Sequence, residues 1–272
     1  MNSGEKPDSH AIDVHTPSVA RMYDWLLGGI EHFASDRAAC QRLLEIAPST
    51  KALALNNRSF LRRVVRVLAE EYGVRQFLDH GSGLPTQDNV HEIAQRVDRR
   101  SRVVYIDSDP IVLARGRIVL EENAETAVLN EDMRETDRIF ERPEVRRLIR
   151  DDEPVAALFV SVLHCLPDED AGALVRRVAE RLPDGSFMVI CQLVSDHASV
   201  REGVTELMRD ATGGNWGRVR ERDEVRQYFD GLLIEDPGLI DVTDWRPDSE
   251  VVPRQRADDW VEWGGLARVI RT

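Results

Sequence analysis

The sequence contains little of what marks a secreted or membrane-bound protein. Its 272 residues include three cysteines, Cys40, Cys165 and Cys191, with no Cys-x-x-Cys pair. An odd number of thiols cannot form a closed disulfide framework, so we expect unbridged core residues. No stretch approaches the ~20 apolar residues that cross a bilayer, and the N-terminus lacks the basic start and apolar run of a secretion signal. These absences predict a cytoplasmic protein without membrane contact.

Positive charge is also scarce. The chain has 36 basic and 49 acidic residues, a formal net charge of -13, and its lysines are Lys6 and Lys51. A negative charge of this size repels nucleic-acid backbones at long range, so we expect a small-molecule ligand and no nucleic acid. We predict no metal site, and no pattern in the chain indicates an oligomeric state.

The chain divides into three parts by composition. Its length suits one α/β domain with an added segment better than two independent domains. Residues 1–15 are polar and lack an apolar period, so we predict a disordered tail, then a helical cap over 16–72 and a ligand-binding domain over 73–272. Helices in the cap are predicted at 19–27, 35–46 and 56–71.

From Gln76 onward, short apolar runs alternate with segments of helical periodicity. The run 155–160 is continuously apolar, as in strands covered on both faces. Strands are expected at 76–79, 103–106, 126–132, 155–160, 187–193, 232–236 and 266–270. Between them we expect helices at 90–97, 110–122, 167–182, 198–210 and 222–230. This alternation predicts a parallel, doubly wound sheet.

A glycine loop follows the first predicted strand, in the order Asp79-His80-Gly81-Ser82-Gly83. In a parallel sheet, ligands bind beyond the carboxyl ends of the strands, where glycines let the backbone approach the ligand. A dinucleotide site prefers a third glycine, but Thr86 stands at that position after Pro85. Asp79 would repel a pyrophosphate, whereas it suits the sulfonium and ammonium of S-adenosylmethionine. The loop therefore favours this methyl donor over NAD.

Two further acidic positions end later strands. Asp107 follows the second strand, 28 residues after Asp79, where a carboxylate can accept hydrogen bonds from both ribose hydroxyls. Asp132 and Met133 follow the third strand, and we predict that they bracket the adenine, with the carboxylate accepting from its amino group. Each residue can instead be a strand-end cap or part of an ordinary turn.

Ser161 and His164 come directly after the long fourth strand, at the same predicted edge of the sheet. We regard Ser161 as a candidate contact of the methyl donor. His164 is a candidate general base, because an imidazole titrates near neutral pH. The alternative for His164 is a structural histidine held by hydrogen bonds.

Three segments resemble a known family: 17–29 (PSVARMYDWLLGG), 77–86 (FLDHGSGLPT) and 104–110 (VYIDSDP). They resemble the S-adenosyl methyltransferases of high-GC bacteria that were once catalogued as a domain of unknown function. The likeness runs from about residue 16 to the segment 263–268 (WGGLAR). The resemblance implies a Rossmann-like class I methyltransferase fold, with a seven-stranded, mostly parallel sheet. Its last strand is expected to be antiparallel, and an N-terminal helical lid to cover the cofactor.

The family also implies which residues hold the cofactor S-adenosylmethionine. These are Asp79, Gly81, Gly83 and Asp107, and we add their neighbours Ser82 and Ser108. Two positions depart from the family pattern. His80 stands where an aliphatic residue is expected, and Ser82 replaces a threonine, which affects the fine hydrogen bonding of the loop.

The helical cap adds hypotheses about a lid and an acceptor pocket. We predict that Tyr23 and Trp25 close over the donor, with Tyr23 also a candidate catalytic residue. The segment around Trp216 is predicted to form part of the acceptor pocket. For each aromatic residue the alternative is core packing. Four arginines of the third helix are interpreted as a solvated face without a role in binding: Arg58, Arg62, Arg63 and Arg66.

The sequence therefore predicts a methyltransferase that uses S-adenosylmethionine to methylate an unidentified small-molecule acceptor. Methyl transfer is an in-line displacement in which the protein mainly aligns the two partners and excludes water, so a strong base is optional. Two alternatives remain open. One is a catalytically silent, donor-binding or regulatory module on the same fold, because no acid–base triad is evident. The other is an NAD(P)-dependent oxidoreductase.

Overall fold

The computed structural model describes residues 13–120, 123–248 and 260–271. The N-terminal part contains α1 (Val19–Leu26), α2 (Ala34–Ile46) and α3 (Thr50–Glu70). Next come β1 (Gln76–His80), α4 (Val90–Val97), β2 (Arg102–Asp107), α5 (Pro110–Val119), β3 (Thr126–Asn130), α6 (Thr136–Glu141), α7 (Pro143–Leu148) and β4 (Ala156–Val160). The remaining elements are η1 (Leu163–Cys165), α8 (Asp168–Arg181), β5 (Phe187–Val194), α9 (Ala198–Ala211), α10 (Arg222–Arg226), η2 (Gln227–Phe229), β6 (Leu233–Ile234), β7 (Ile240–Asp241) and β8 (Val261–Arg268).

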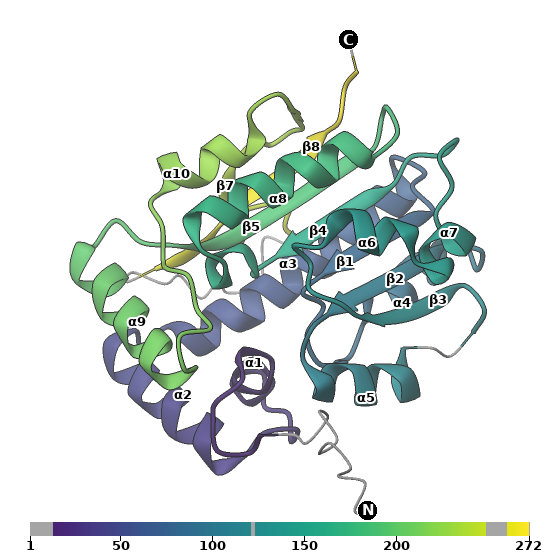
Figure 1. The fold of residues 1–272 in the computed structure, drawn as a ribbon. Coiled ribbons are helices and arrows are strands. Elements are labelled where there is room, and N and C mark those ends of the chain that lie inside the picture. Colours follow the sequence, from purple (N-terminus) through teal and green to yellow (C-terminus); the bar gives the residue numbers. More distant parts are fainter. Residues whose placement is uncertain (1–12, 121–122, 249–259, 272) are drawn as a thin grey trace, which may run out of the picture.

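The described strands form one sheet in the order β3-β2-β1-β4-β5-β8-β6, and β7 also pairs with β8 (Figure 1). Strands β1 to β5 pair in parallel, whereas β8 is antiparallel to β5, β6 and β7. The predicted doubly wound sheet with an antiparallel last strand is confirmed. The predicted number of seven strands is one too low, because the two-residue β7 is too short to leave a periodic pattern.

Both faces of the sheet are covered by helices, and alternate residues of each strand face opposite sides. On β1 and β4, Phe77 and Leu158 pack in one cluster with α3 and α4, while Leu78 and Phe159 pack in another with α7 and α8. All residues of β1 and β5 are buried. This double cover explains the continuous apolar run of β4 and the nearly continuous one of β5.

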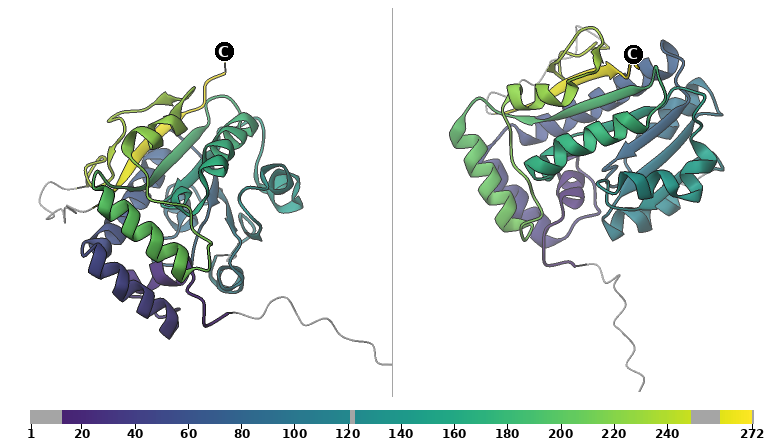
Figure 2. Two further views of the ribbon diagram at one scale, coloured as in Figure 1. Left: turned by 60° about the vertical axis from the view of Figure 1, so that its left-hand side comes forward. Right: turned by 45° about the horizontal axis from the view of Figure 1, so that its top comes forward.

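Helix α1 lies at the carboxyl edge of the sheet (Figure 1), with α2 packed against it, whereas α3 covers a face. Figures 1 and 2 show α1 at the ends of the strands, between α2 and α5. Buried residues of α1, α2 and α9 form one cluster, which includes Met22, Leu43 and Val204. A buried ion pair fixes α1, with Arg21 Nε 2.8 Å from Asp36 Oδ2 and both side chains at most 4% exposed. The first helix is thus held over the edge where a doubly wound sheet binds ligands.

Some predicted boundaries change. Helix α3 begins at Thr50, before the predicted residue 56, and β8 begins at Val261, before residue 266. Residues 1–12 of the predicted tail lie outside the described residues. At 14–16 the chain makes a bend, and Asp13 Oδ1 accepts the backbone N–H groups of His15 and Thr16.

The interpretation of the α3 arginines as one solvated face is wrong for Arg63. Its side chain is buried, and its guanidinium donates to the carbonyl oxygens of Trp245 and Val242 at 2.9 and 2.6 Å. Arg63 therefore ties α3 to the segment between β7 and β8. The two carbonyl oxygens accept hydrogen bonds from the buried guanidinium. Helical periodicity in the sequence does not reveal such distant partners.

Neither a membrane span nor a metal site appears in the described part of the chain. No helix there is long and apolar enough to cross a bilayer. No three His, Cys, Asp or Glu side chains of these residues are grouped to hold a metal ion. The three cysteines are unbridged, with Cys40 and Cys191 buried and Cys165 half-buried.

Candidate active site

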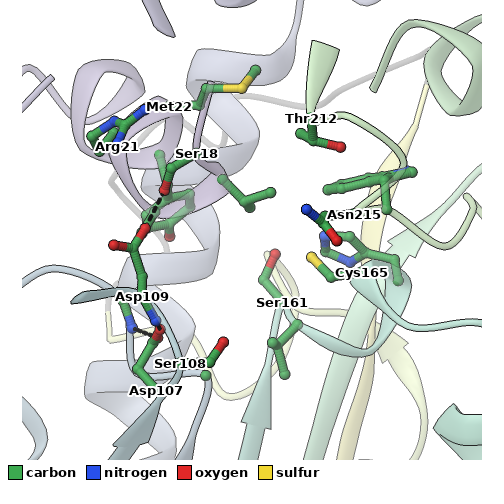
Figure 3. A pocket seen from close by; sticks show the side chains of 18 of the residues that line it. Ser18, Arg21, Met22, Asp107, Ser108, Asp109, Ser161, Cys165, Thr212 and Asn215 are labelled. Carbon is green, nitrogen blue, oxygen red and sulfur yellow. Dashed lines mark hydrogen bonds between the residues drawn. The ribbon is translucent and has the colours of Figure 1, made fainter. Parts of the chain in front are cut away.

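A cavity of about 760 Å³ lies at the carboxyl edge of the sheet, next to α1. Its size is within the range of roughly 300–1,000 Å³ that is typical of small-molecule sites. Two walls face each other across it (Figure 3). We call the segments 79–83 and 107–109 the glycine wall. The segments 161–166, 208–216 and 260–262 form the opposite side, which we call the tryptophan wall.

The glycine loop lies at the tip of β2. The backbone N–H of Gly81 donates to the carbonyl oxygen of Ile106 at 2.8 Å, and Gly83 N–H donates to Asp107 Oδ2 at 2.9 Å. Both glycines have a positive φ, of +68° and +66°. A Cβ at Gly81 would lie 2.3 Å from a methyl carbon of Val162, so no side chain fits there. The loop is therefore shaped by β2 and by the segment after β4.

Asp107 organises the glycine wall. Besides Gly83 N–H, its carboxylate accepts the backbone N–H of Asp109 at 2.9 Å. Asp109 accepts from the backbone N–H of Ile111, which caps α5, and from the hydroxyl of Ser18 (Figure 3). Burial raises the pKa of Asp107 to about 6, although the hydrogen bonds from the backbone N–H groups of Gly83 and Asp109 lower it. The network joins the loop after β1, the loop after β2 and the start of α1.

Asp79 is a second buried carboxyl of the same wall and is 7% exposed. Burial raises its pKa to about 7; Asp107 adds to the shift, and the positive charge of Arg58 opposes it. Arg58 also lines the cavity, a placement that the prediction of a solvated face missed. Burial disfavours the anionic form of both carboxyls, so a cation that binds near them stabilises the anions.

The other predicted donor contacts also line this cavity, namely Ser82, Ser108, Asp132, Met133 and Ser161. The hydroxyl oxygen of Ser82 is buried and has no hydrogen-bond partner among the described residues. Both carboxylate oxygens of Asp132 accept from the guanidinium of Arg134, at about 3 Å or less, which lowers the pKa of Asp132. This ion pair leaves fewer lone pairs on Asp132 for an adenine amino group.

His80, the departure from the family pattern, faces the core rather than the cavity. Its ring stacks on Phe159 with a centroid distance of 4.4 Å, and 1% of the residue is exposed. Burial lowers the pKa of His80 to about 4, so the imidazole is neutral. It replaces an aliphatic side chain as a flat core residue.

Tyr23 lines the cavity from α1, but Trp25 does not. The hydroxyl of Tyr23 donates to the carbonyl oxygen of Ala54 at 3.1 Å and accepts from Asn57 Nδ2 at 2.9 Å. Burial raises the pKa of Tyr23, which keeps the phenol protonated. The ring of Trp25 is 4.3 Å from the ammonium of Lys51. The prediction that Trp25 closes over the donor is therefore wrong.

His164 and Trp216 lie together on the tryptophan wall, with ring centroids 4.8 Å apart. Burial, with the nearby charge of Arg220, lowers the pKa of His164 to about 3. Arg220 is buried and donates to the carbonyl oxygens of Leu163 and Leu166, at 3.0 and 2.9 Å, which fixes the turn that carries His164. A neutral imidazole can donate or accept a hydrogen bond here, but its low pKa makes it a weak base.

Glu262 and Trp260 are cavity residues that the sequence reasoning missed. Glu262 is 2% exposed and accepts a hydrogen bond from the hydroxyl of Ser161. Burial raises the pKa of Glu262 to about 8. The available signal was a glutamate between Trp260 and Trp263 at the start of an apolar strand. Its place at the cavity follows from the antiparallel direction of β8.

Comparison with known proteins decides the family. A model of the S-adenosyl methyltransferase family matches residues 5–270. The chain belongs to this family. No curated protein matches the chain. Among solved structures, a Thermobifida fusca protein whose suggested activity is methyl transfer is 36% identical, with a TM-score of 0.87 over 95% of this chain and 97% of that one. A DUF574 family protein from Streptomyces avermitilis is 34% identical, with a TM-score of 0.84 over 94% of this chain and 98% of that one.

This S-adenosyl methyltransferase is thus an enzyme with a Rossmann-like class I fold, and its cofactor is S-adenosylmethionine. The residues of the glycine wall fit this group. There is no room for a side chain at Gly81, which leaves the backbone of the loop accessible to a ligand. The Ser82 hydroxyl has no hydrogen-bond partner among the described residues, and the buried carboxyls of Asp79 and Asp107 suit a cation. The family membership overturns the alternative of an NAD(P)-dependent oxidoreductase.

Proposed function

We propose that the enzyme methylates a small organic molecule that binds in the same cavity as the methyl donor. The observation that carries this proposal is the extent of the cavity. It runs from the glycine wall to the tryptophan wall, and α1 with the preceding residues contributes to its lining. A concave site of this volume, lined from several elements, favours a small molecule over a long polymer.

The donor is assigned to the glycine wall. Asp107 is positioned to accept from ribose hydroxyls, with Gly81 and Gly83 leaving room for the nucleoside and Ser82 free to pair with it. Asp79 is assigned to the cationic end of the donor. Burial and the negative charge of Asp107 both disfavour the Asp79 carboxylate, and a bound cation would stabilise it. Ser108, Asp132 and Met133 complete this part of the lining.

The acceptor is assigned to the tryptophan wall. Trp216 and Trp260 line the cavity there, each with 6% or less of its surface exposed, and Met208 and Leu193 add to the apolar lining. Such surfaces bind flat, apolar bodies, while the few polar atoms between them fix orientation. An acceptor held in this region lies across the cavity from Asp107, and Ser161 is drawn between Asp107 and Asn215 (Figure 3).

In the reaction, the bound donor supplies an electrophilic methyl group on a positively charged sulfur. The chain aligns the acceptor with that methyl and excludes water, which is where most of the rate enhancement of such a displacement arises. We assign His164 to hydrogen bonding and orientation of the acceptor, because its low pKa disfavours proton abstraction. Tyr23 is assigned to the lid, since Ala54 and Asn57 already engage its hydroxyl.

A thermal-shift comparison tests the donor site. S-Adenosylmethionine and S-adenosylhomocysteine are each expected to stabilise the protein by about 2.7 kcal/mol at 100 times their Kd. NAD and NADP at equal concentration serve as controls and are expected to give no shift. Stabilisation by the nicotinamide cofactors alone would contradict the assignment.

The size of the acceptor needs a separate measurement. Enzyme and methyl-labelled donor are incubated with a bacterial extract that has been separated by ultrafiltration into low-molecular-mass and macromolecular fractions. Label is expected to enter the low-molecular-mass fraction. Label in protein or nucleic acid would overturn the small-molecule proposal, and donor binding without any transfer would favour the catalytically silent module.

A further inference from the structure

Glu262 reaches the cavity because of the direction of its strand. Strand β8 is antiparallel to β5, so its first residues lie at the edge where β4 and β5 end. In the register of this pair, Glu262 stands opposite Leu193, and both residues line the cavity. A buried carboxyl is therefore placed on the tryptophan wall, apart from the carboxyls of the glycine wall.

The two oxygens of Glu262 have different surroundings. Oε1 accepts the hydroxyl hydrogen of Ser161, while Oε2 is buried without a hydrogen-bond partner in the described ranges. Ser161 has a φ of +58°, a left-handed conformation that non-glycine residues seldom adopt. The carboxyl is held through Oε1, the Cys191 thiol lies close enough to lower its pKa, and Oε2 is a buried oxygen without a hydrogen-bond partner among the described residues.

Burial favours the neutral form of Glu262 when no cation is bound. Its charged neighbour is the Asp241 carboxylate of β7, and the Cys191 thiol of β5 and the Tyr23 phenol of α1 are uncharged. Burial raises the pKa of Glu262 to about 8, Asp241 adds to the shift, and Ser161 and Cys191 reduce it. A positive charge brought into the cavity would favour the carboxylate form.

We propose that Oε2 of Glu262 accepts the proton that the methyl acceptor loses, so that the acceptor is a small molecule reacting through an O–H or N–H group. The inference rests on the proposed function. The lone pair of the acceptor oxygen or nitrogen forms the bond to the methyl carbon, and the electron pair of the broken carbon–sulfur bond stays on sulfur. The acceptor proton passes to the Glu262 carboxylate and leaves with the next exchange of ligands.

Neighbouring polar atoms support this class of acceptor. The indole N–H groups of Trp216 and Trp260 and Nδ1 of His164 are also buried without partners among the described residues. Buried groups of this kind are costly unless a ligand completes their hydrogen bonds. A molecule that pairs with all of them carries acceptor atoms as well as an O–H or N–H, on a body apolar enough for the two indole rings.

The test compares two ligands that differ in charge. S-Adenosylmethionine and S-adenosylhomocysteine share their adenosine and amino-acid parts, so the ratio of their Kd values isolates the effect of the methyl group and the positive charge. The ratio is measured by isothermal titration from pH 6 to 9. If binding of S-adenosylmethionine ionises Glu262, the Kd of S-adenosylhomocysteine divided by that of S-adenosylmethionine rises with pH. The total rise is about tenfold for each unit by which donor binding lowers the pKa of Glu262.

Two matched variants separate the buried carboxyls. Glu262→Gln keeps the shape and is expected to lose the rise between about pH 7 and 8.5, because the group with a pKa of about 8 is gone. Asp79→Asn is expected to lose the increase in the Kd ratio near pH 7, where Asp79 titrates, and to keep the increase at higher pH that comes from Glu262. Circular dichroism checks that both variants are folded.

Other results would overturn the inference. A wild-type ratio that does not change with pH, or a folded Glu262→Gln variant that keeps the upper rise, means that Glu262 does not respond to the donor. A folded variant that binds neither ligand makes Glu262 part of the donor site. If Glu262→Gln does not fold, Ser161→Ala replaces it and must move the rise to higher pH, because the Ser161 hydrogen bond lowers the pKa of Glu262. Failure of the wild type to bind either ligand would instead refute the proposed function.

Discussion

The two walls of the cavity satisfy their polar groups in different ways. On the glycine wall, Asp107 accepts from the backbone of Gly83 and Asp109, and Gly81 donates to β2. The tryptophan wall has four side chains with a buried polar atom that finds no partner among the described residues: His164, Trp216, Trp260 and Glu262. The glycine wall is shaped mainly by its own backbone, although Ser82 Oγ and His80 Nδ1 are also without partners among the described residues. The other depends on a ligand to complete its hydrogen bonds, so substitutions should act differently on the two.

The largest effect is expected at Gly81. Gly81→Ala forces a side chain into the left-handed region and against Val162, which should cost about 2–4 kcal/mol of unfolding free energy and abolish donor binding. Gly83 is the matched control, because it has a similar φ but open space around a Cβ. Gly83→Ala should lose about 1–2 kcal/mol. Urea unfolding measures both, and equal losses would refute the crowding at Gly81.

The next effect concerns the carboxylate that holds the glycine wall together. Asp107→Ala removes the acceptor of two backbone N–H groups and of the proposed ribose contact, so the Kd for S-adenosylmethionine should rise about 10- to 100-fold. Asp132→Ala is the control, with a rise of about threefold expected because Arg134 already engages that carboxylate. Calorimetry measures both. If Asp132→Ala were the more damaging change, the donor would lie nearer to β3 than proposed.

The residues of the glycine wall were predicted from the sequence, whereas Glu262 of the tryptophan wall was missed. Asp79, Gly81 and Asp107 belong to a local pattern of strand, loop and helix, so their meeting at one edge followed from a parallel sheet. Glu262 is far from them in the sequence and enters the cavity because β8 inserts antiparallel beside β5. Trp25 was misassigned because a helical pattern does not tell which aromatic side chain faces a cavity.

Predictability varied in the same way for the fold. Strands β1 to β5 each contain an apolar run and were recognisable, whereas β7 has two residues and left no pattern. Arg63 lies on the charged side of α3 in the sequence, yet distant carbonyl oxygens bury it. Local periodicity cannot include such partners, since it does not know which loop packs on which helix.

A smaller effect is expected where α1 meets the glycine wall. Ser18→Ala removes the hydrogen bond from its hydroxyl to Asp109, a net loss of about 1 kcal/mol, so donor binding should weaken about fivefold. Ser35→Ala deletes another hydroxyl of the cap, one that donates to Val14 in an exposed place, and should leave the Kd unchanged. Stopped-flow dissociation rates distinguish them. Equal rates in the two variants would show that α1 does not restrain the donor.

The smallest effect is expected on the tryptophan wall. Trp216→Phe keeps an aromatic ring beside His164 but removes the unpartnered indole N–H. The Kd for S-adenosylmethionine should change by less than about twofold, or 0.4 kcal/mol, because the donor is assigned to the opposite wall. Calorimetry under the same conditions measures it. A tenfold loss would place the donor against Trp216 and remove the distinction between the walls.

The antiparallel insertion of β8 also bears on how the protein is made. During translation, β5 leaves the ribosome long before residues 261–268, so its outer edge stays unpaired until the final strand emerges. An exposed edge of this kind can pair with other chains and promote aggregation. Because β8 carries Glu262 as well, the nascent chain covers the edge of β5 and completes the cavity lining in the same late step.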